Sequence, residues 1–310
     1  MKVFVGGGSG LAGSAILRAA PIDVELFHPT HSELPLENYP QVFDYFKENK
    51  ISHVILAAGQ VGGILANNFH QKDFLLENLK IQNSVFQAAV ENDIKNFIFL
   101  GSSCIYPRLA IQPIKEEALL TGLLEPTNEG YALAKICGIK LCTAIHKEYG
   151  YNYVALMPSN LYGLNDNFDR SNSHVPAALM RKIHEAKLAN AREVDIWGSG
   201  EVKREFMSSK DLANACWYFL NSEYGGELIN IGTGVDISIL EFASILKTII
   251  GYQGKFKLDL SKPNGTPRKL LDVSKATSFG WQSSIDLKAG LSETYEWFVE
   301  QYGEGSIRGY

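Results

Sequence analysis

The chain has 310 residues, of which 45% are hydrophobic and 20% are charged, and its formal net charge is −5. This composition is that of an ordinary globular protein, and the length fits one large domain or two modest ones. The acidic balance excludes a nucleic-acid partner, because there is no basic excess to neutralise phosphates. It leaves room for an anionic small ligand that a few local cations and helix N-termini could hold.

The four cysteines show neither CxxC spacing nor a dense disulfide pattern. We therefore expect reduced thiols in a cytoplasmic protein, and no metal site is predicted. No run approaches the ~18 apolar residues that span a bilayer, so a soluble protein without a membrane partner is expected. Glycines interrupt the apolar N-terminal stretch, which fits a strand and a turn better than a signal peptide.

Short β-branched runs alternate with helix-period segments through the first half of the chain. Strands are expected at residues 2–7, 23–29, 52–59, 96–103 and 153–161, and helices at residues 10–20, 74–92 and 131–149. Nearly continuous apolar strands between helices predict a doubly wound parallel sheet of the Rossmann type. Ligands of such sheets bind beyond the carboxyl ends of the strands.

The pattern becomes looser in the second half. Loops are expected at residues 165–173 and 259–268, helices at residues 175–189 and 238–250, and a strand at residues 225–234. We predict a dinucleotide-binding domain over residues 1–165, with a late strand from the 205–234 region returning to its sheet. Residues 166–310 are predicted to form a smaller α/β substrate-binding domain.

A glycine-rich turn follows the first expected strand. Gly7, Gly10 and Gly13 form GxxGxxG, and Leu11 and Ala12 open the helix after it. Glycines at this spacing permit a tight turn and a close approach of the backbone to a diphosphate. A purely structural turn is the alternative, but the position between strand and helix favours dinucleotide binding.

The end of the second expected strand bears on which dinucleotide binds. NAD-binding proteins commonly place an acidic residue there, whereas this chain continues with residues 28–32, HPTHS. The missing carboxylate favours NADP(H). No arginine is present, however, and Ser9 and His31 are weak ligands for a 2′-phosphate, so NAD(H) stays open.

Tyr131 and Lys135 form YxxxK near the start of an expected helix. Residues four apart are neighbours on one helix face, and a lysine ammonium is expected to lower the pKa of the phenol. The tyrosine could then exchange a proton with a carbonyl oxygen. Ser102 ends the fourth strand and could bind the same oxygen, although Ser103 could do so equally on sequence grounds.

Seven segments then carry a specific resemblance. They are residues 57–68 (AAGQVGGILANN), 101–107 (GSSCIYP), 125–135 (EPTNEGYALAK), 158–163 (PSNLYG), 166–175 (DNFDRSNSHV), 197–206 (WGSGEVKREF) and 263–272 (PNGTPRKLLD). The chain resembles the GDP-L-fucose synthase family almost from end to end. These extended short-chain dehydrogenases epimerise GDP-4-keto-6-deoxy-D-mannose at C3 and C5 and reduce its C4 ketone with NADPH.

The resemblance implies roles for individual residues. Ser102, Tyr131 and Lys135 match the reductase triad, and Cys104 and His174 match the acid–base pair of epimerisation. Positions beside the nicotinamide are matched by Leu100, Gly101, Ser102, Ser103, Lys135, Pro158, Ser159, Asn160, Leu161 and His174. Positions that hold the GDP-sugar are matched by Lys182, Trp197, Arg204 and Asp272. At Lys182 the family commonly has arginine, as bacterial members often do at Ser9 and His31.

A thiol and an imidazole suit this chemistry, because hydrogens next to a ketone are acidic and must be removed and returned on opposite faces. The three other cysteines, Cys137, Cys142 and Cys216, are interpreted as packing residues. The resemblance also implies a homodimer, for which the helix at residues 131–149 offers Ile136, Ile139 and Cys142.

Two alternatives stay open at this stage. One is a reductase or epimerase of another GDP-4-keto sugar, such as a GDP-heptose. The other is a non-catalytic dinucleotide-sensing protein, which the intact Ser102, Tyr131 and Lys135 disfavour.

Overall fold

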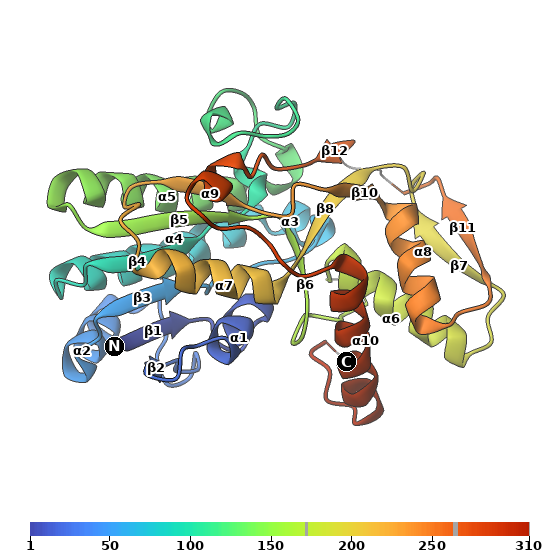
Figure 1. Ribbon diagram of the computed structural model, residues 1–310, viewed down its shortest axis with the longest axis horizontal. Coiled ribbons are helices and arrows are strands. Elements are labelled where there is room, and N and C mark those ends of the chain that lie inside the picture. The colour runs from blue at the N-terminus through green and yellow to red at the C-terminus, as the bar shows by residue number, and fades with distance from the viewer. Residues whose placement is uncertain (171–172, 263–265, 310) are drawn as a thin grey trace.

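The computed structural model describes residues 1–170, 173–262 and 266–309. Its larger part is a six-stranded parallel sheet in the order β2-β1-β3-β4-β5-β9 (Figure 1). The strands are β1 (Lys2–Gly6), β2 (Glu25–Phe27), β3 (His53–Leu56), β4 (Asn96–Leu100), β5 (Asn152–Pro158) and β9 (Leu228–Ile231). The predicted Rossmann architecture is thereby confirmed.

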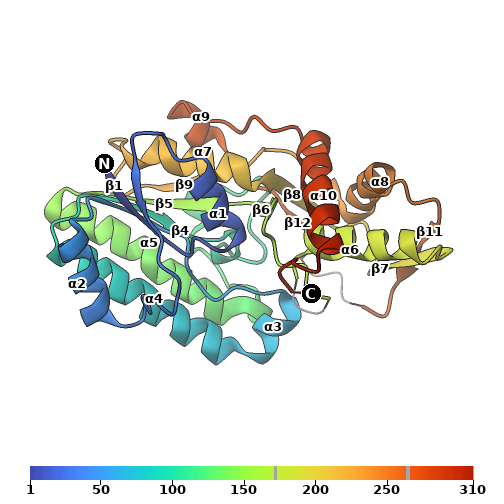
Figure 2. The ribbon, with the colours of Figure 1, turned by 90° about the horizontal axis from the view of Figure 1, so that it is seen from below.

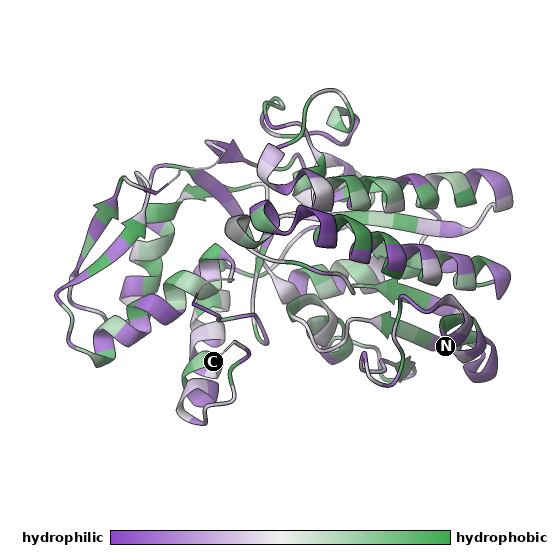
Figure 3. Cartoon of the chain, turned by 180° about the vertical axis from the view of Figure 1, so that it is seen from behind, coloured by the Kyte–Doolittle hydropathy of each residue, from purple (hydrophilic) through white to green (hydrophobic). Residues whose placement is uncertain are grey.

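Helices cover both faces of this sheet, as Figure 2 shows from below. One face packs on α2 (Tyr39–Asn49), α4 (Gln71–Glu91) and α5 (Glu129–Tyr149), and the other on α1 (Leu11–Arg18), α7 (Ser209–Leu220) and α9 (Ser274–Ser278). The helix α3 (Ile64–Phe69) precedes α4, and short 3-10 turns η1 (Ser103–Ile105), η2 (Glu116–Ala118) and η3 (Pro126–Asn128) lie between β4 and α5. The apolar strands between these layers stand out in Figure 3.

A smaller part of the molecule has its own hydrophobic core. It contains α6 (Val175–Leu188), α8 (Ile239–Ile250) and α10 (Leu287–Gly303). The strand β8 (Lys203–Ser208) pairs with β6 (Asn160–Tyr162), β10 (Asp236–Ser238) and β12 (Arg268–Lys269), and β7 (Glu193–Trp197) pairs with β11 (Lys255–Asp259).

Several expected elements differ from the observed ones. The strand expected over residues 153–161 divides into β5 and β6, and β6 leaves the large sheet to pair with β8. Within the 205–234 region, β9 joins the large sheet as expected, whereas β8 belongs to the smaller part. The helix α7, in the expected second domain, packs on the large sheet. The division of the chain at residue 165 stays a prediction.

The cysteines and the proposed dimer residues also need correction. Cys142 and Cys216 are buried as expected, but Cys137 is exposed on α5. Ile136, Ile139 and Cys142 lie in the core of the protomer, with at most 6% of their surface exposed, so they are not available to a partner. Among the described residues, no helix has the length and apolar character needed to cross a bilayer.

Candidate functional site

The glycine-rich turn between β1 and α1 has the geometry that the sequence predicts. Gly7 has φ +85°, and a side-chain carbon at Gly13 would lie 2.0 Å from the carbonyl oxygen of Gly7. Gly10 caps α1 without a side-chain hydrogen bond to the helix N-terminus. The backbone N–H groups at Leu11 and Ala12 therefore open toward the carboxyl end of the sheet, as a diphosphate requires.

The end of β2 offers little positive charge. The exposed His31 lies 3.0 Å from the carboxylate of Glu37, and Glu33 accepts hydrogen bonds from the backbone and hydroxyl of Thr30. His28 lies closer to the glycine turn, because a side-chain carbon at Gly8 would be 3.1 Å from its Cβ. The structure thus pairs His31 with an acid and places His28 against the turn, which sequence reasoning did not separate.

Ser102, Cys104 and Tyr131 converge at the carboxyl end of β4. Ser102 has extended backbone angles and opens η1, which turns Cys104 back so that its N–H lies 3.5 Å from the Ser102 hydroxyl. The same hydroxyl lies near enough to the phenol of Tyr131 and the thiol of Cys104 to lower the pKa of each. Of the two serines, Ser102 acts on the pKa of Tyr131, whereas Ser103 lines a small cavity with Lys269.

Tyr131 and Lys135 share one face of α5, as the spacing predicts. The Lys135 ammonium lies 5.7 Å from the centre of the Tyr131 ring and donates a 2.9 Å hydrogen bond to the carbonyl of Leu100. Burial lowers the pKa of Lys135 to about 8. Burial raises the pKa of Tyr131, so the expected lowering by Lys135 is not observed and the phenol stays protonated.

Cys104 has opposing influences on its ionisation. Burial is the largest influence and raises the pKa of its thiol overall, while the charges of Lys269 and Lys135 and the neighbouring Ser102 hydroxyl oppose that rise. Lys269 is on β12, in register with Arg204 of β8, and it shares with Ser103 the lining of a cavity of about 10 Å³. Sequence reasoning missed Lys269, although its segment RKLLD lies in a block singled out for Asp272.

Replacing Lys269 by methionine will make the Cys104 thiol harder to ionise. Loss of a neighbouring cation removes stabilisation of the thiolate, so the pKa of Cys104 rises and its alkylation by iodoacetamide requires higher pH. The rate–pH profile is measured in a Cys137→Ser background, which removes the exposed thiol. The control Lys203→Met removes an exposed lysine of β8 and should leave the profile unchanged.

Most positions expected beside a nicotinamide lie where β4 ends and where β5 passes into β6. Gly101 leaves no room for a side chain, since a carbon there would lie 1.8 Å from the methyl of Met157. Ser159 donates its N–H to Ile231, yet its buried hydroxyl has no hydrogen-bond partner among the described residues. An unpaired buried hydroxyl at this edge fits a ligand that would supply the missing partner.

His174 opens α6, where its carbonyl accepts the N–H of Ala178. Its side chain keeps contact with solvent, but enough protein surrounds it that desolvation lowers the pKa of the imidazole. It is therefore mostly neutral at pH 7 and able to act as a base or, once protonated, as an acid. Residues 171–172 of its sequence block lie outside the described residues.

The residues expected to hold the GDP-sugar lie in three places. Lys182 donates to the carbonyl of Asp195 on β7, and Trp197 ends that strand with 53% of its surface exposed. Arg204 lies on β8, and its positive charge helps to lower the pKa of Lys269, which lies near Cys104. Asp272 instead binds the N–H of Ser274 at the start of α9.

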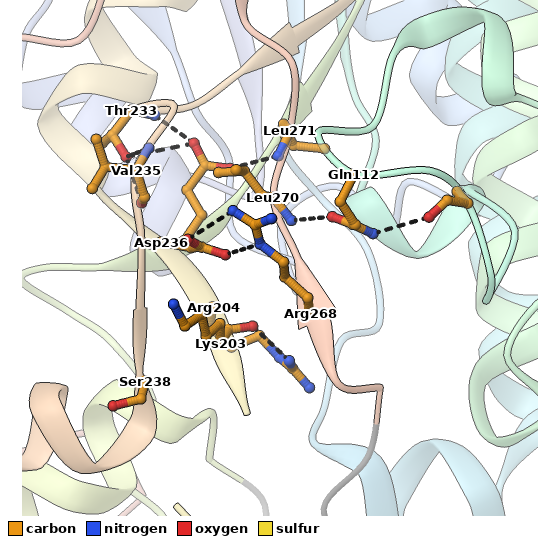
Figure 4. Close-up of polar contacts among 12 residues, drawn as sticks. Gln112, Lys203, Arg204, Thr233, Val235, Asp236, Ser238, Arg268, Leu270 and Leu271 are labelled. Atoms are coloured by element: carbon orange, nitrogen blue, oxygen red, sulfur yellow. Dashed lines mark hydrogen bonds and ion pairs between the residues drawn. The ribbon is translucent and has the colours of Figure 1, made fainter. Parts of the chain in front are cut away.

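A buried carboxylate, Glu205, fixes the strands that carry these cations. It is fully buried in β8 and accepts the N–H groups of Thr233, Gly234 and Leu271. Figure 4 shows the surrounding contacts, in which Arg268 pairs with Asp236. Glu205 thereby fixes β12 beside β8, which sets the position of Lys269 relative to Arg204.

Comparison with known proteins gives consistent matches. Residues 3–232 match the model of the NAD dependent epimerase/dehydratase family. The chain is 51% identical to a putative GDP-L-fucose synthase of Arabidopsis thaliana (96% of this chain, 92% of the relative) and 48% identical to the GDP-L-fucose synthase of Escherichia coli (96% and 97%). The solved structure of MlghC, a GDP-mannoheptose C4 reductase from Campylobacter jejuni with NADP bound, is 36% identical with a TM-score of 0.88 and covers 96% of this chain and 98% of that one.

Proposed function

We propose a function on the premise that the chain belongs to the NAD dependent epimerase/dehydratase family and, within it, to the GDP-L-fucose synthases. The chain is an NADP-dependent oxidoreductase with epimerase activity. It epimerises GDP-4-keto-6-deoxy-D-mannose at C3 and C5 and reduces the C4 ketone to give GDP-L-fucose. The observation that carries this function is the thiol of Cys104 beside the Ser102–Tyr131 pair.

Epimerisation requires a base, an acid and an oxyanion site. Cys104 as thiolate takes a proton from the carbon next to the ketone, and the electron pair moves onto the C4 oxygen as an enolate. Ser102 and Tyr131 hydrogen-bond this oxygen and stabilise its charge. His174 returns a proton to the opposite face of the carbon, and the same exchange operates at C3 and C5.

Reduction uses the same carbonyl. NADPH, when bound, supplies the hydride to C4. Tyr131, which burial holds in its protonated form, donates its proton to the C4 oxygen, and Ser102 holds that oxygen in place. Lys135 is a buried cation beside the phenol and stabilises the tyrosinate that the transfer leaves.

The residues present fit the dinucleotide and the GDP moiety. The N–H groups after Gly10 and the unpaired hydroxyl of Ser159 would hold the diphosphate and the nicotinamide end. The rest of the dinucleotide site would be formed by Leu100, Gly101, Ser103, Pro158, Asn160 and Leu161. His31 has the weakest support as a cofactor ligand, because Glu37 pairs with it. Lys182, Trp197, Arg204 and Asp272 are proposed to hold the GDP-sugar.

A single incubation tests the function. The enzyme is mixed with GDP-4-keto-6-deoxy-D-mannose in deuterated buffer with excess NADPH or NADH, and the product is analysed by NMR. We expect GDP-L-fucose carrying deuterium at C3 and C5, formed faster with NADPH. Recovery of a C4-reduced product without this deuterium would contradict the epimerase role.

The GDP-heptose alternative has one observation in its favour, namely the likeness to a GDP-mannoheptose C4 reductase. The near-full-length identities of 48–51% to GDP-L-fucose synthases support the 6-deoxyhexose substrate more strongly. Competition between the two keto-sugars separates the readings, because the preferred substrate has the larger kcat/KM.

We further propose a homodimer, a cytoplasmic location and the two-domain division at residue 165. The outward faces of α4 and α5 expose Leu76 and Leu133, whose surfaces are 43% and 40% accessible, and they supply an apolar surface for a second copy. A catalytic thiol also suits a reducing compartment. Light scattering of the purified enzyme checks the oligomeric state.

A further inference from the structure

Residues 307–309, which follow α10, pack against the loop before α6. After α10, Ile307 is buried with 4% of its surface exposed, and the carbonyl of Arg308 accepts the N–H of Phe168 at 2.9 Å. The Arg181 guanidinium donates to the carbonyls of Gly309 at 2.9 Å and Phe168 at 2.7 Å. The backbone of residues 307–309 is therefore fixed in place by the loop before α6.

This anchoring places the Arg308 side chain at the glycine-rich turn. A side-chain carbon at Gly10 would lie 3.6 Å from the Arg308 Nη1 and 3.6 Å from the carbonyl oxygen of Gly7. The missing side chain of this glycine is what lets a dinucleotide diphosphate approach the N-terminus of α1. The guanidinium thus borders the space that the diphosphate would enter.

The charge of Arg308 is available to a ligand. Among the described residues its guanidinium makes no hydrogen bond or ion pair, and it acts electrostatically on Asp166. Burial raises the pKa of Asp166 to about 7, so this neighbour is a weak counter-charge at neutral pH.

We propose that Arg308 binds the diphosphate of the dinucleotide and closes its site from the C-terminal tail. A guanidinium offers two parallel N–H donors to phosphate oxygens, opposite the N–H groups of α1. Both NADPH and NADH contain this diphosphate, so Arg308 contributes affinity without selecting between them.

Cofactor binding without any sugar tests this role, independently of the proposed reaction. We expect Arg308→Gln to weaken binding of NADPH and NADH by the same factor, about tenfold or more, measured by calorimetric titration. Arg308→Lys keeps the charge but loses the two parallel N–H donors of the guanidinium, so its affinity for both dinucleotides should fall between those of Arg308→Gln and the wild type. Adenosine 2′-monophosphate lacks the diphosphate and should bind all forms equally. The matched control Arg192→Gln removes an exposed arginine at the far end of β7.

A second readout needs no variant. Trypsin cleaves after arginine, so mass spectrometry can follow hydrolysis of the Arg308–Gly309 bond in the wild-type protein, and both dinucleotides should slow it. Wild-type affinity in Arg308→Gln together with unprotected cleavage would overturn the proposal. A loss confined to NADPH and adenosine 2′-monophosphate would also overturn it, because Arg308 would then bind the 2′-phosphate.

Discussion

Cys104→Ser will lose uptake of solvent deuterium at C3 and C5 of the keto-sugar by about 10²-fold or more, while NADPH binds as in the wild type. A serine hydroxyl is almost never ionised near neutral pH, whereas the thiol is assisted by the cations of Lys269 and Lys135. The substitution keeps the shape of the side chain and its place after Ser102. Its effect therefore falls on proton removal. The exchange is followed by NMR in deuterated buffer without reductant.

Cys137→Ser is the matched control, since it removes an exposed thiol from α5 and should exchange at the wild-type rate. Equal exchange in Cys104→Ser and the wild type would show that another group is the base. Comparing C3 with C5 adds resolution, because loss at one carbon alone would assign Cys104 to one of the two epimerisations.

The sheet and the turn at its N-terminal strand could be predicted because local patterns determine them. The run KVFVGG has no alternation of apolar and polar residues, which predicts a strand buried on both faces. At Gly7 and Gly13 the structure leaves no room for a side chain. The YxxxK spacing likewise fixes Tyr131 and Lys135 on one helix face. Periodicity and spacing act within a few residues, and these features lie within that range.

Features that depend on distant segments could not be predicted in the same way. Lys269 reaches Cys104 because Glu205 binds Leu271 and fixes β12 on β8, and no local pattern reports a pairing across some 60 residues. The break between β5 and β6 at Ser159 also depends on a distant segment, because β6 pairs with β8 and not with the large sheet that contains β5. The pKa of Tyr131 depended on burial, which outweighs the neighbouring Lys135.

Tyr131→Phe will lower the kcat of ketone reduction by about 10²- to 10⁴-fold, the usual contribution of a positioned general acid. The phenylalanine ring can keep the edge contact with Phe74, whose ring centre is 6.3 Å away, so packing and cofactor affinity should be preserved. Tyr149→Phe, an exposed position on the same helix, is the control and should reduce at the wild-type rate. NADPH consumption in stopped-flow single turnovers measures the step.

The dependence of the reduction rate on pH distinguishes the role of Tyr131 from that of Lys135. Because burial raises the pKa of Tyr131 above its ordinary value, the phenol stays protonated through the assayable range and imposes no decline of its own. Lys135, with its pKa lowered to about 8, is cationic below that pH and neutral above it. Reduction by the wild type should therefore decline as the pH rises through about 8, and Lys135→Met should be slow at every pH and lack that decline. A decline near pH 8 that persists in Lys135→Met would assign the titration to another group and remove Lys135 from the mechanism.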